Sequence, residues 1–314
     1  MTRARAAAIA NDPEVEALAA ASLVSSGSSL DAVIAGFFAA GALHSGVLMS
    51  PVMVLLAGVG EGAFAFDGRP LQPGRGTRRP RGFADPEKIP DAARVAVPTS
   101  LATVLFAHAY GRGRSLRALI EPAAALAKKK GAEKRAALLQ RIAEVWAAAL
   151  AEPIYRRPLL RVGSPSEGGL LTPSDLEPAE LAAEPLQERT FGDDRWLVPP
   201  SVQAEPSRSS AIVAVDAQGV FAGLAYQTLE RGVRLDELEL LAPLTATPVL
   251  RGVPRVLPGA RIGSGFAFGL ALDQRTRPIE LLFQASRSQL DDPSDGPRIS
   301  IVRDPDTRLV SSRR

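Results

Sequence analysis

Apolar positions with helical spacing dominate the first half of the chain, whereas short apolar runs bounded by turn residues dominate the second. The helical spacing predicts helices at 13–26, 30–43, 101–110, 115–130 and 132–150. Strands are predicted at 52–57, 62–66, 188–191, 195–198, 211–215, 220–226, 266–272 and 279–284. Residues 71–90 and 156–169 are predicted to be irregular, and Thr172 to cap a short helix. Helices followed by mainly antiparallel strands favour a layered α+β domain.

The first two helices carry the clearest local signals. Asp12 precedes a proline at the first helical position and Gly27 follows the last apolar position, a pattern typical of a capped helix. Ser28 or Ser29 can cap the next helix, in which 34–41 is apolar on nearly all sides. A helix without a polar face is expected to be buried between layers. The apolar run 47–59 is too short to span a bilayer, which favours a buried strand or helix segment.

Composition narrows the class of protein. A chain of 314 residues with 46% hydrophobic content can bury one large core or two modest ones. The 37 basic and 34 acidic residues nearly balance, so we expect neither a nucleic-acid nor a membrane partner. Cysteine is absent and the two histidines are far apart in sequence, which argues against disulfides, a thiol nucleophile, a metal site and a cofactor.

No internal repeat or boundary divides the chain into two cores. We therefore expect a single domain over 1–290, followed by a polar, partly strand-like tail over 291–314. The N-terminal segment reaches Asp12 before an apolar stretch of secretory length develops, which predicts a cytoplasmic protein.

The segment after Arg208 is the candidate site. Ser209 and Ser210 precede two apolar runs joined by the turn 216–219, a pattern that predicts a β-hairpin. Adjacent hydroxyl groups would then lie at the mouth of a sheet, where N-terminal-nucleophile hydrolases keep a catalytic serine or threonine. Paired serines before a strand are also ordinary loop residues, so the pattern by itself leaves both interpretations open.

A series of motifs in a fixed order resembles the γ-glutamyltransferase family. The matching segments are 17–33, 44–47, 67–69, 97–98, 110–123, 168–176 and 199–201. Their collinear order over about residues 10–285 carries the resemblance. It implies the four-layer αββα sandwich of N-terminal-nucleophile hydrolases, with two mainly antiparallel sheets between helical layers. It also implies a precursor cut before a threonine, whose own α-amine serves as base in the attack on a γ-glutamyl amide.

Carried onto this chain, the resemblance places the nucleophile at Ser209. Gln227 stands where the family has a threonine that hydrogen-bonds the nucleophile, and Ser210 follows the nucleophile directly. Arg69, in the motif that begins at Asp67, would bind the α-carboxylate of a small γ-glutamyl or amino-acid-like ligand, because its planar guanidinium suits bidentate capture. In isolation, Arg69 is more typical of an exposed surface turn, and that interpretation is the preferred one without the resemblance.

The chain departs from the family pattern at the residues that carry the chemistry. Loss of one oxyanion donor alone costs about 3 to 4 kcal/mol of transition-state stabilisation. After the nucleophile position, Ser210-Ala211 stands in place of Thr-His, and Leu229 stands in place of a substrate-contacting asparagine. Arg287-Ser288 stands in place of the Gly-Gly of the oxyanion hole, and 48–51 lacks the family's glycines. Only residues 202–208 separate the Pro-Pro-Ser motif from Ser209.

These observations leave three hypotheses. The first is a γ-glutamyltransferase-like protein with a degenerate active site, weak or no turnover and a binding or regulatory role. The second is an active γ-glutamyl transferase or amidohydrolase that uses Ser209 after self-cleavage. The third is an oligomeric structural protein whose apolar segments 47–59 and 240–250 form an interface between copies. His108 is interpreted as a helix-face residue, and Asp216 as the residue that stabilises its turn.

Overall fold

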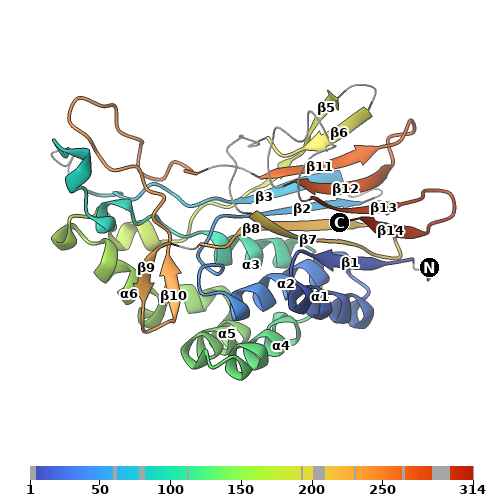
Figure 1. Cartoon of the computed structure of the whole chain (residues 1–314), viewed down its shortest axis with the longest axis horizontal. Helices are drawn as coiled ribbons and strands as arrows, with labels where there is room; N and C mark the ends of the chain where they lie inside the picture. The colour runs from blue at the N-terminus through green and yellow to red at the C-terminus, as the bar shows by residue number, and fades with distance from the viewer. Residues whose placement is uncertain are drawn as a thin grey trace.

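The computed structural model describes residues 5–58, 62–77, 82–111, 113–191, 194–200, 209–229, 231–263, 266–284 and 298–313. Two antiparallel sheets pack face to face, and helices cover the first of them (Figure 1). The first sheet has the order β1 (Ala7–Ala10), β7 (Ser209–Val215), β8 (Phe221–Gln227), β2 (Val52–Gly58), β3 (Gly62–Gly68), β4 (Ala183–Pro185). The second has the order β14 (Val310–Arg313), β13 (Arg298–Arg303), β12 (Pro278–Gln284), β11 (Ala267–Leu272), β6 (Asp194–Val198), β5 (Gln187–Phe191).

The helices lie in the first half of the chain, as the sequence predicts. They are α1 (Pro13–Ser26), α2 (Ser29–Leu43), α3 (Ser100–Gly111), α4 (Leu116–Lys129), α5 (Glu133–Val145) and α6 (Pro153–Gly163). A small separate hairpin is formed by β9 (Val233–Leu235) and β10 (Leu240–Ala242). The predicted α+β sandwich with two antiparallel sheets is confirmed. Within the described residues, α1, α2 and α3 pack on the first sheet and no helix packs comparably on the second, so the described helices cover one side of the sandwich.

The two sheets share an apolar interior, and β2 lies at its centre. Val52, Val54 and Leu56 belong to the core between this strand and the helices. The alternate residues Met53, Leu55 and Ala57 belong to the core between the two sheets. Burial on both faces explains the continuous apolar run, because alternation is expected only where one face of a strand meets water. The run is internal, so it offers no surface for an interface between copies.

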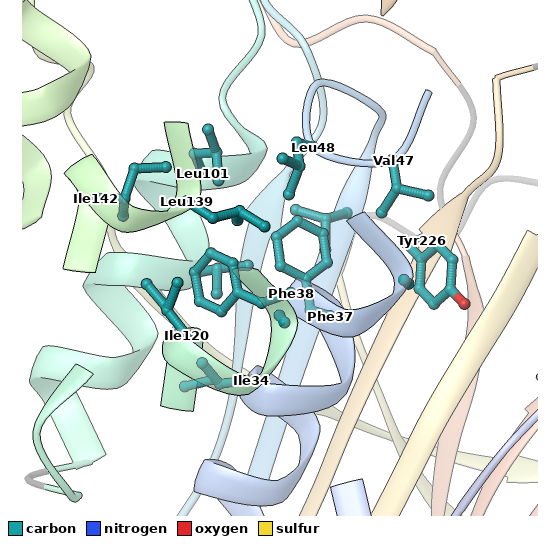
Figure 2. Close-up of a cluster of buried hydrophobic side chains, with 14 of the residues drawn as sticks. Ile34, Phe37, Phe38, Val47, Leu48, Leu101, Ile120, Leu139, Ile142 and Tyr226 are labelled. Atoms are coloured by element: carbon teal, nitrogen blue, oxygen red, sulfur yellow. The ribbon is translucent and has the colours of Figure 1, made fainter. Parts of the chain in front are cut away.

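Helix α2 is buried on all sides, as its sequence predicts. Every residue from Ser29 to Ala42 is buried. Phe37 and Phe38 pack edge to face with ring centroids 5.6 Å apart. Figure 2 shows Ile120, Leu139 and other side chains of neighbouring elements around these two rings. The helix therefore lies between the first sheet and the outer helices α4 and α5.

Capping fixes where α1 begins and ends. Asp12 Oδ1 accepts hydrogen bonds from the backbone N–H groups of Glu14 (2.8 Å) and Val15 (3.2 Å). Gly27 closes the helix with φ +72°, a left-handed conformation that glycine adopts without steric cost. These are the two capping residues that the sequence indicates.

Replacing Asp12 by alanine is expected to lower the free energy of unfolding by about 1 kcal/mol, because two helix N–H groups lose their acceptor. Urea unfolding followed by circular dichroism measures the change. Asp12→Asn is the matched control, since asparagine caps about as well. His44 lies 3.9 Å from Asp12. If Asn and Ala cost the same, the charge of Asp12 rather than its cap is what stabilises this region.

The structure corrects the secondary-structure prediction at several places. Residues 156–169 were predicted to be irregular, yet α6 extends to Gly163 with Tyr155 and Leu159 buried. Strand β1 was not predicted, and it forms by pairing with β7. Residues 298–313, part of the predicted partly strand-like tail, supply β13 and β14 to the second sheet.

No helix in the described part of the chain is both long and apolar enough to cross a bilayer.

Candidate functional site

One end of the first sheet brings the sequence-predicted site residues together. Ser209 begins β7 and pairs with Gln227 at the end of β8. The Gln227 backbone N–H donates to the carbonyl oxygen of Pro51, directly before β2. Strand β3 ends beside the start of β2, so Arg69 follows at the same end of the sheet. With about 4.8 Å between neighbouring strands, β7 and β3 are roughly 14 Å apart.

Strand alternation separates these side chains between the two faces of the sheet. Ala211 and Ala225 contribute to the core between the sheets, so Ser209 and Gln227, each two residues away, share that face. Directly opposed residues of an antiparallel pair have Cβ atoms about 5 Å apart, so these two side chains are neighbours. Asp67 pairs with Met53, which also faces the second sheet. The predicted nucleophile, its neighbour Gln227 and Asp67 thus lie on one face.

Ser210 points to the opposite, helix-covered face. It pairs with Tyr226, whose side chain belongs to the core beneath the helices, and the two side chains share a hydrogen bond. Burial, together with the negative charge of Asp12, raises the pKa of Tyr226 above its ordinary value. Ser210 is therefore engaged on the side of the sheet away from Ser209. Ser209 and Ser210 were predicted to lie in one site, but β7 places their side chains on opposite faces of the sheet.

Asp67 is the centre of a buried charge cluster. Its carboxylate is 2% exposed and accepts hydrogen bonds from Arg69 Nη2 (2.8 Å) and Nε (3.0 Å to Oδ2). Arg261 approaches from a distant loop, with Nε 3.6 Å from Asp67 Oδ2 and Nη1 donating to the Asp67 carbonyl at 2.5 Å. Thr99 Oγ1 donates to the Arg69 carbonyl at 2.9 Å. Two guanidinium groups share one carboxylate, so the cluster carries one excess positive charge.

This geometry determines what Arg69 can do. Its side chain is only 12% exposed, so it is not an exposed turn arginine. Asp67 holds the guanidinium by its Nε and Nη2 atoms, which fixes the orientation of the remaining N–H groups. A guanidinium held in place, with excess positive charge beside it, suits an anion such as a carboxylate. Arg261 was not singled out from the sequence, because it lies outside every recognised motif and reaches the site only through folding.

Solved structures share this architecture, although no protein-family model and no curated protein matches the sequence. Cephalosporin acylase from Bacillus halodurans superposes with a TM-score of 0.73 at 12% identity, over 99% of this chain and 94% of that one. LmbA2991 superposes with a TM-score of 0.70 at 13% identity, over 100% and 98%. Helicobacter pylori γ-glutamyltranspeptidase gives 0.53 at 16% identity, over 64% and 71%. This chain has the N-terminal-nucleophile hydrolase fold.

Within the N-terminal-nucleophile hydrolase fold, the motif at 168–176 has a structural role. Asp175 is 3% exposed. Its two oxygens accept hydrogen bonds from the backbone N–H groups of Gly74, Arg75 and Thr172, at 2.9 to 3.0 Å, and from Thr172 Oγ1 at 3.1 Å. The carboxylate therefore fastens the loop that follows the Arg69 segment to the short 3₁₀ helix Pro173–Leu176.

Two further residues behave as the sequence predicts. Asp216 Oδ1 accepts from the N–H groups of Gln218, Gly219 and Val220, each at 3.0 Å, and so stabilises the turn of the hairpin. His108 lies on α3, with Nε2 2.7 Å from the carbonyl oxygen of Arg114.

The loop before β2 is packed into the core. Leu48 and Met49 are fully buried, and Ser100 Oγ donates to the Leu48 carbonyl at 2.6 Å. Gly46 lies against the backbone of Leu229, so close that a Cβ atom would be 2.4 Å from its carbonyl oxygen. Where the γ-glutamyltransferase motif has a run of glycines, this chain has side chains that fill the interior.

Several predicted features lie outside the described residues. They are Arg208 of the predicted cleavage site, Ser201 of the Pro-Pro-Ser motif and the pair Arg287-Ser288 at the expected oxyanion position. Among the residues that the structure does describe, no group of three or more His, Asp or Glu side chains has an arrangement that could hold a metal ion.

Proposed function

We propose that this chain is a γ-glutamyltransferase-like protein that binds a small carboxylate-bearing, amino-acid-like ligand at the end of the first sheet, with weak or no turnover. The observation that supports it is the buried Asp67 carboxylate shared by Arg69 and Arg261, on the same face and at the same sheet end as Ser209 and Gln227. Its excess positive charge would attract the carboxylate, and the fixed guanidinium of Arg69 would orient it.

The proposed ligand would lie along the end of the first sheet. The strands β7 and β3 are roughly 14 Å apart, and the Arg69 guanidinium is held beside Asp67 on β3, so the rest of the ligand would extend across β2 and β8 toward β7. The carboxylate would lie toward Arg69, and the far end of the ligand would reach Ser209 and Gln227. Those two side chains would then contact its amide or other polar end.

The proposal of weak turnover rests on the departures of the chain from the family pattern around Ser209. A serine hydroxyl needs a base to become a nucleophile. Ser210, which follows Ser209, is bonded to Tyr226 on the other face of the sheet. The α-amine of Ser209 could serve as base only if the chain were cut before it. The second candidate, an active amidohydrolase with Ser209 as nucleophile, is favoured by the pairing of Ser209 with Gln227 at the same sheet end, and on the same face, as Asp67. A homo-oligomer would have to use surfaces other than the internal run 47–57.

Intact-mass measurement tests the choice between these functions. We expect one species of 33.1 kDa, the mass of the whole chain, that persists over days. Hydrolysis of a chromogenic γ-glutamyl anilide should then be slow and equal in the wild type and in Ser209→Ala, with Ser210→Ala as the matched control. Two fragments split before Ser209, together with a rate that Ser209→Ala abolishes, would establish the amidohydrolase instead.

Calorimetric titration with L-glutamine and with 4-aminobutyramide, which lacks the α-carboxylate, tests ligand binding. We expect L-glutamine to bind at least tenfold more tightly, because a charge-assisted pair contributes about 1.5 to 3 kcal/mol. Arg69→Lys should remove most of that preference, since lysine keeps the charge but not the planar fork. Arg117→Lys, on the exposed face of α4, is the control. Equal binding of the two compounds to the wild type would contradict the proposed carboxylate site.

A further inference from the structure

A pocket of about 390 Å³ lies on the helix-covered side of the first sheet. It is enclosed by α3, the 3₁₀ turn Trp146–Ala151, the start of α6 and the segment that follows Asp175. Its volume is in the range of small-molecule sites in proteins. Most of its wall is apolar, contributed by Val97, Pro98, Leu105, Phe106, Leu150 and Leu176.

The pocket is distinct from the candidate site described above. Phe66 on β3 faces the helices and packs edge to face on Phe106, a residue of the pocket wall. Asp67, the next residue, faces the opposite side. The first sheet therefore separates the pocket from the row of Ser209, Gln227 and Asp67.

Tyr155 is a lining residue of the pocket with a hydroxyl group that can donate a hydrogen bond. Its side chain is buried, at 5% exposure, and lines the pocket. It has no hydrogen-bond partner among the residues that the structure describes, and its oxygen is not enclosed by protein atoms. Burial raises the pKa of this phenol, so it stays protonated and can donate. Because the oxygen is not enclosed, an acceptor on a ligand in the pocket can take the hydrogen bond that this hydroxyl would otherwise make with water.

His108 presents the complementary group. It is 5% exposed and lines the same pocket. Its Nε2 lies 2.7 Å from the Arg114 carbonyl oxygen, which can only accept, so this nitrogen carries the proton. In the neutral imidazole, Nδ1 is then a bare acceptor, and it has no partner within the described ranges. The mostly apolar lining of the pocket thus includes one side chain that can donate a hydrogen bond and one that can accept it.

Trp146 forms part of the pocket wall. Its indole packs edge to face on His108, with ring centroids 6.0 Å apart, and the side chain is 48% exposed. Its backbone has φ +58°, a conformation that costs a residue with a side chain about 1 to 3 kcal/mol. The fold therefore keeps the strained backbone of Trp146 in place, with its large aromatic ring at the rim of the pocket.

The charges around the pocket do not favour an ionic ligand. The Asp175 carboxylate already accepts hydrogen bonds from the backbone N–H groups of Gly74, Arg75 and Thr172. Arg156 donates from Nε to the Leu150 carbonyl at 3.1 Å, and the exposed Glu177 lies on the same rim with the opposite charge.

We propose that this pocket binds a small, neutral aromatic molecule that carries one hydroxyl group. The hydroxyl oxygen of the ligand accepts a hydrogen bond from the Tyr155 hydroxyl. The same ligand hydroxyl donates a hydrogen bond to His108 Nδ1. The ring lies among the apolar side chains and against Trp146.

Three matched probes test the proposal by calorimetric titration of the full chain. The phenol 4-ethylphenol offers a donor and an acceptor, 4-ethylanisole offers only an acceptor, and ethylbenzene offers neither. We expect 4-ethylphenol to bind about tenfold more tightly than ethylbenzene, with 4-ethylanisole between them. Equal affinity for the three probes, no binding of 4-ethylphenol up to its solubility limit, or tighter binding of the charged 4-ethylbenzoate would each overturn the proposal.

Tyr155→Phe removes one oxygen atom and keeps the ring. It should bring 4-ethylphenol to within about threefold of ethylbenzene while leaving ethylbenzene binding unchanged. Tyr110→Phe is the matched control, because Tyr110 belongs to the same helical layer but packs on Phe64 and Phe66. Urea unfolding of both variants checks that they are folded. A folded Tyr155→Phe variant that binds 4-ethylphenol like the wild type contradicts the assignment.

Discussion

Replacing Asp67 by alanine is expected to lower the free energy of unfolding by about 3 to 5 kcal/mol, the cost of removing one partner from a buried ion pair. The carboxylate is 2% exposed, and the side chains of Arg69 and Arg261 are 12% and 23% exposed. Without it, two guanidinium groups remain close together in a poorly hydrated place. Their mutual repulsion adds to the lost hydrogen bonds. Urea unfolding at neutral pH measures the change.

A surface carboxylate provides the control. Glu121 lies 3.9 Å from Arg117 on α4, and both side chains are more than half exposed. Glu121→Ala should change stability by less than about 0.5 kcal/mol. In the Asp67→Ala background, Arg69→Met should restore part of the loss, because it removes one of the two unpaired charges. If Asp67→Ala costs no more than Glu121→Ala, the cluster is hydrated, and the carboxylate site proposed on it loses its support.

The helical half of the fold could be predicted because its signals are local. The caps of α1 and the apolar circumference of α2 depend on neighbours within a few residues in sequence. Helix α6 was missed because Pro153 and Pro158 suggest irregular structure. Pro153, however, occupies the first turn, where its missing N–H is harmless, and burial of Tyr155 stabilises the helix. Tertiary packing outweighed the local signal.

Features that depend on distant segments could not be predicted in this way. Strand β1 is alanine-rich and has a weak strand signal of its own, and it forms through pairing of Ile9 with Val213 and of its neighbours. The candidate site shows the same division. Motif resemblance located Ser209, Asp67 and Arg69, whereas Arg261 arrives at the cluster through a long-range contact. The separation of Ser209 from Ser210 follows from strand alternation, which takes effect once the register of β7 is fixed.

The motif 168–176 shows that a family resemblance does not by itself distinguish chemistry from architecture. Its aspartate is aligned with a γ-glutamyltransferase pattern, yet in this chain all of its contacts are to backbone and to one threonine. It fastens the loop at 74–75 that follows the Arg69 segment. The contribution of these hydrogen bonds to the free energy of unfolding can be measured independently of any activity.

Replacing Asp175 by alanine is expected to lower the free energy of unfolding by about 3 to 5 kcal/mol. The buried N–H groups of Gly74, Arg75 and Thr172 would lose their charge-assisted acceptor. Asp175→Asn should cost nearly as much. Both carboxylate oxygens accept hydrogen bonds from N–H groups, so an amide NH₂ must face at least one donor whichever way it is turned. Urea unfolding measures the global loss. The rate of tryptic cleavage after Arg75 measures release of the loop, which should accelerate in both variants.

Asp85→Asn is the matched control for that substitution. At Asp85 one oxygen accepts from the Glu87 N–H at 2.9 Å, and the other lies 3.6 Å from the exposed Lys88. Asparagine can keep the first bond, so its cost should stay below about 0.5 kcal/mol. An Asp175→Asn variant as stable as the wild type would mean that water satisfies the freed donors. In that case the loop, and with it the orientation of Arg69, depends on other contacts such as the bond from Thr99.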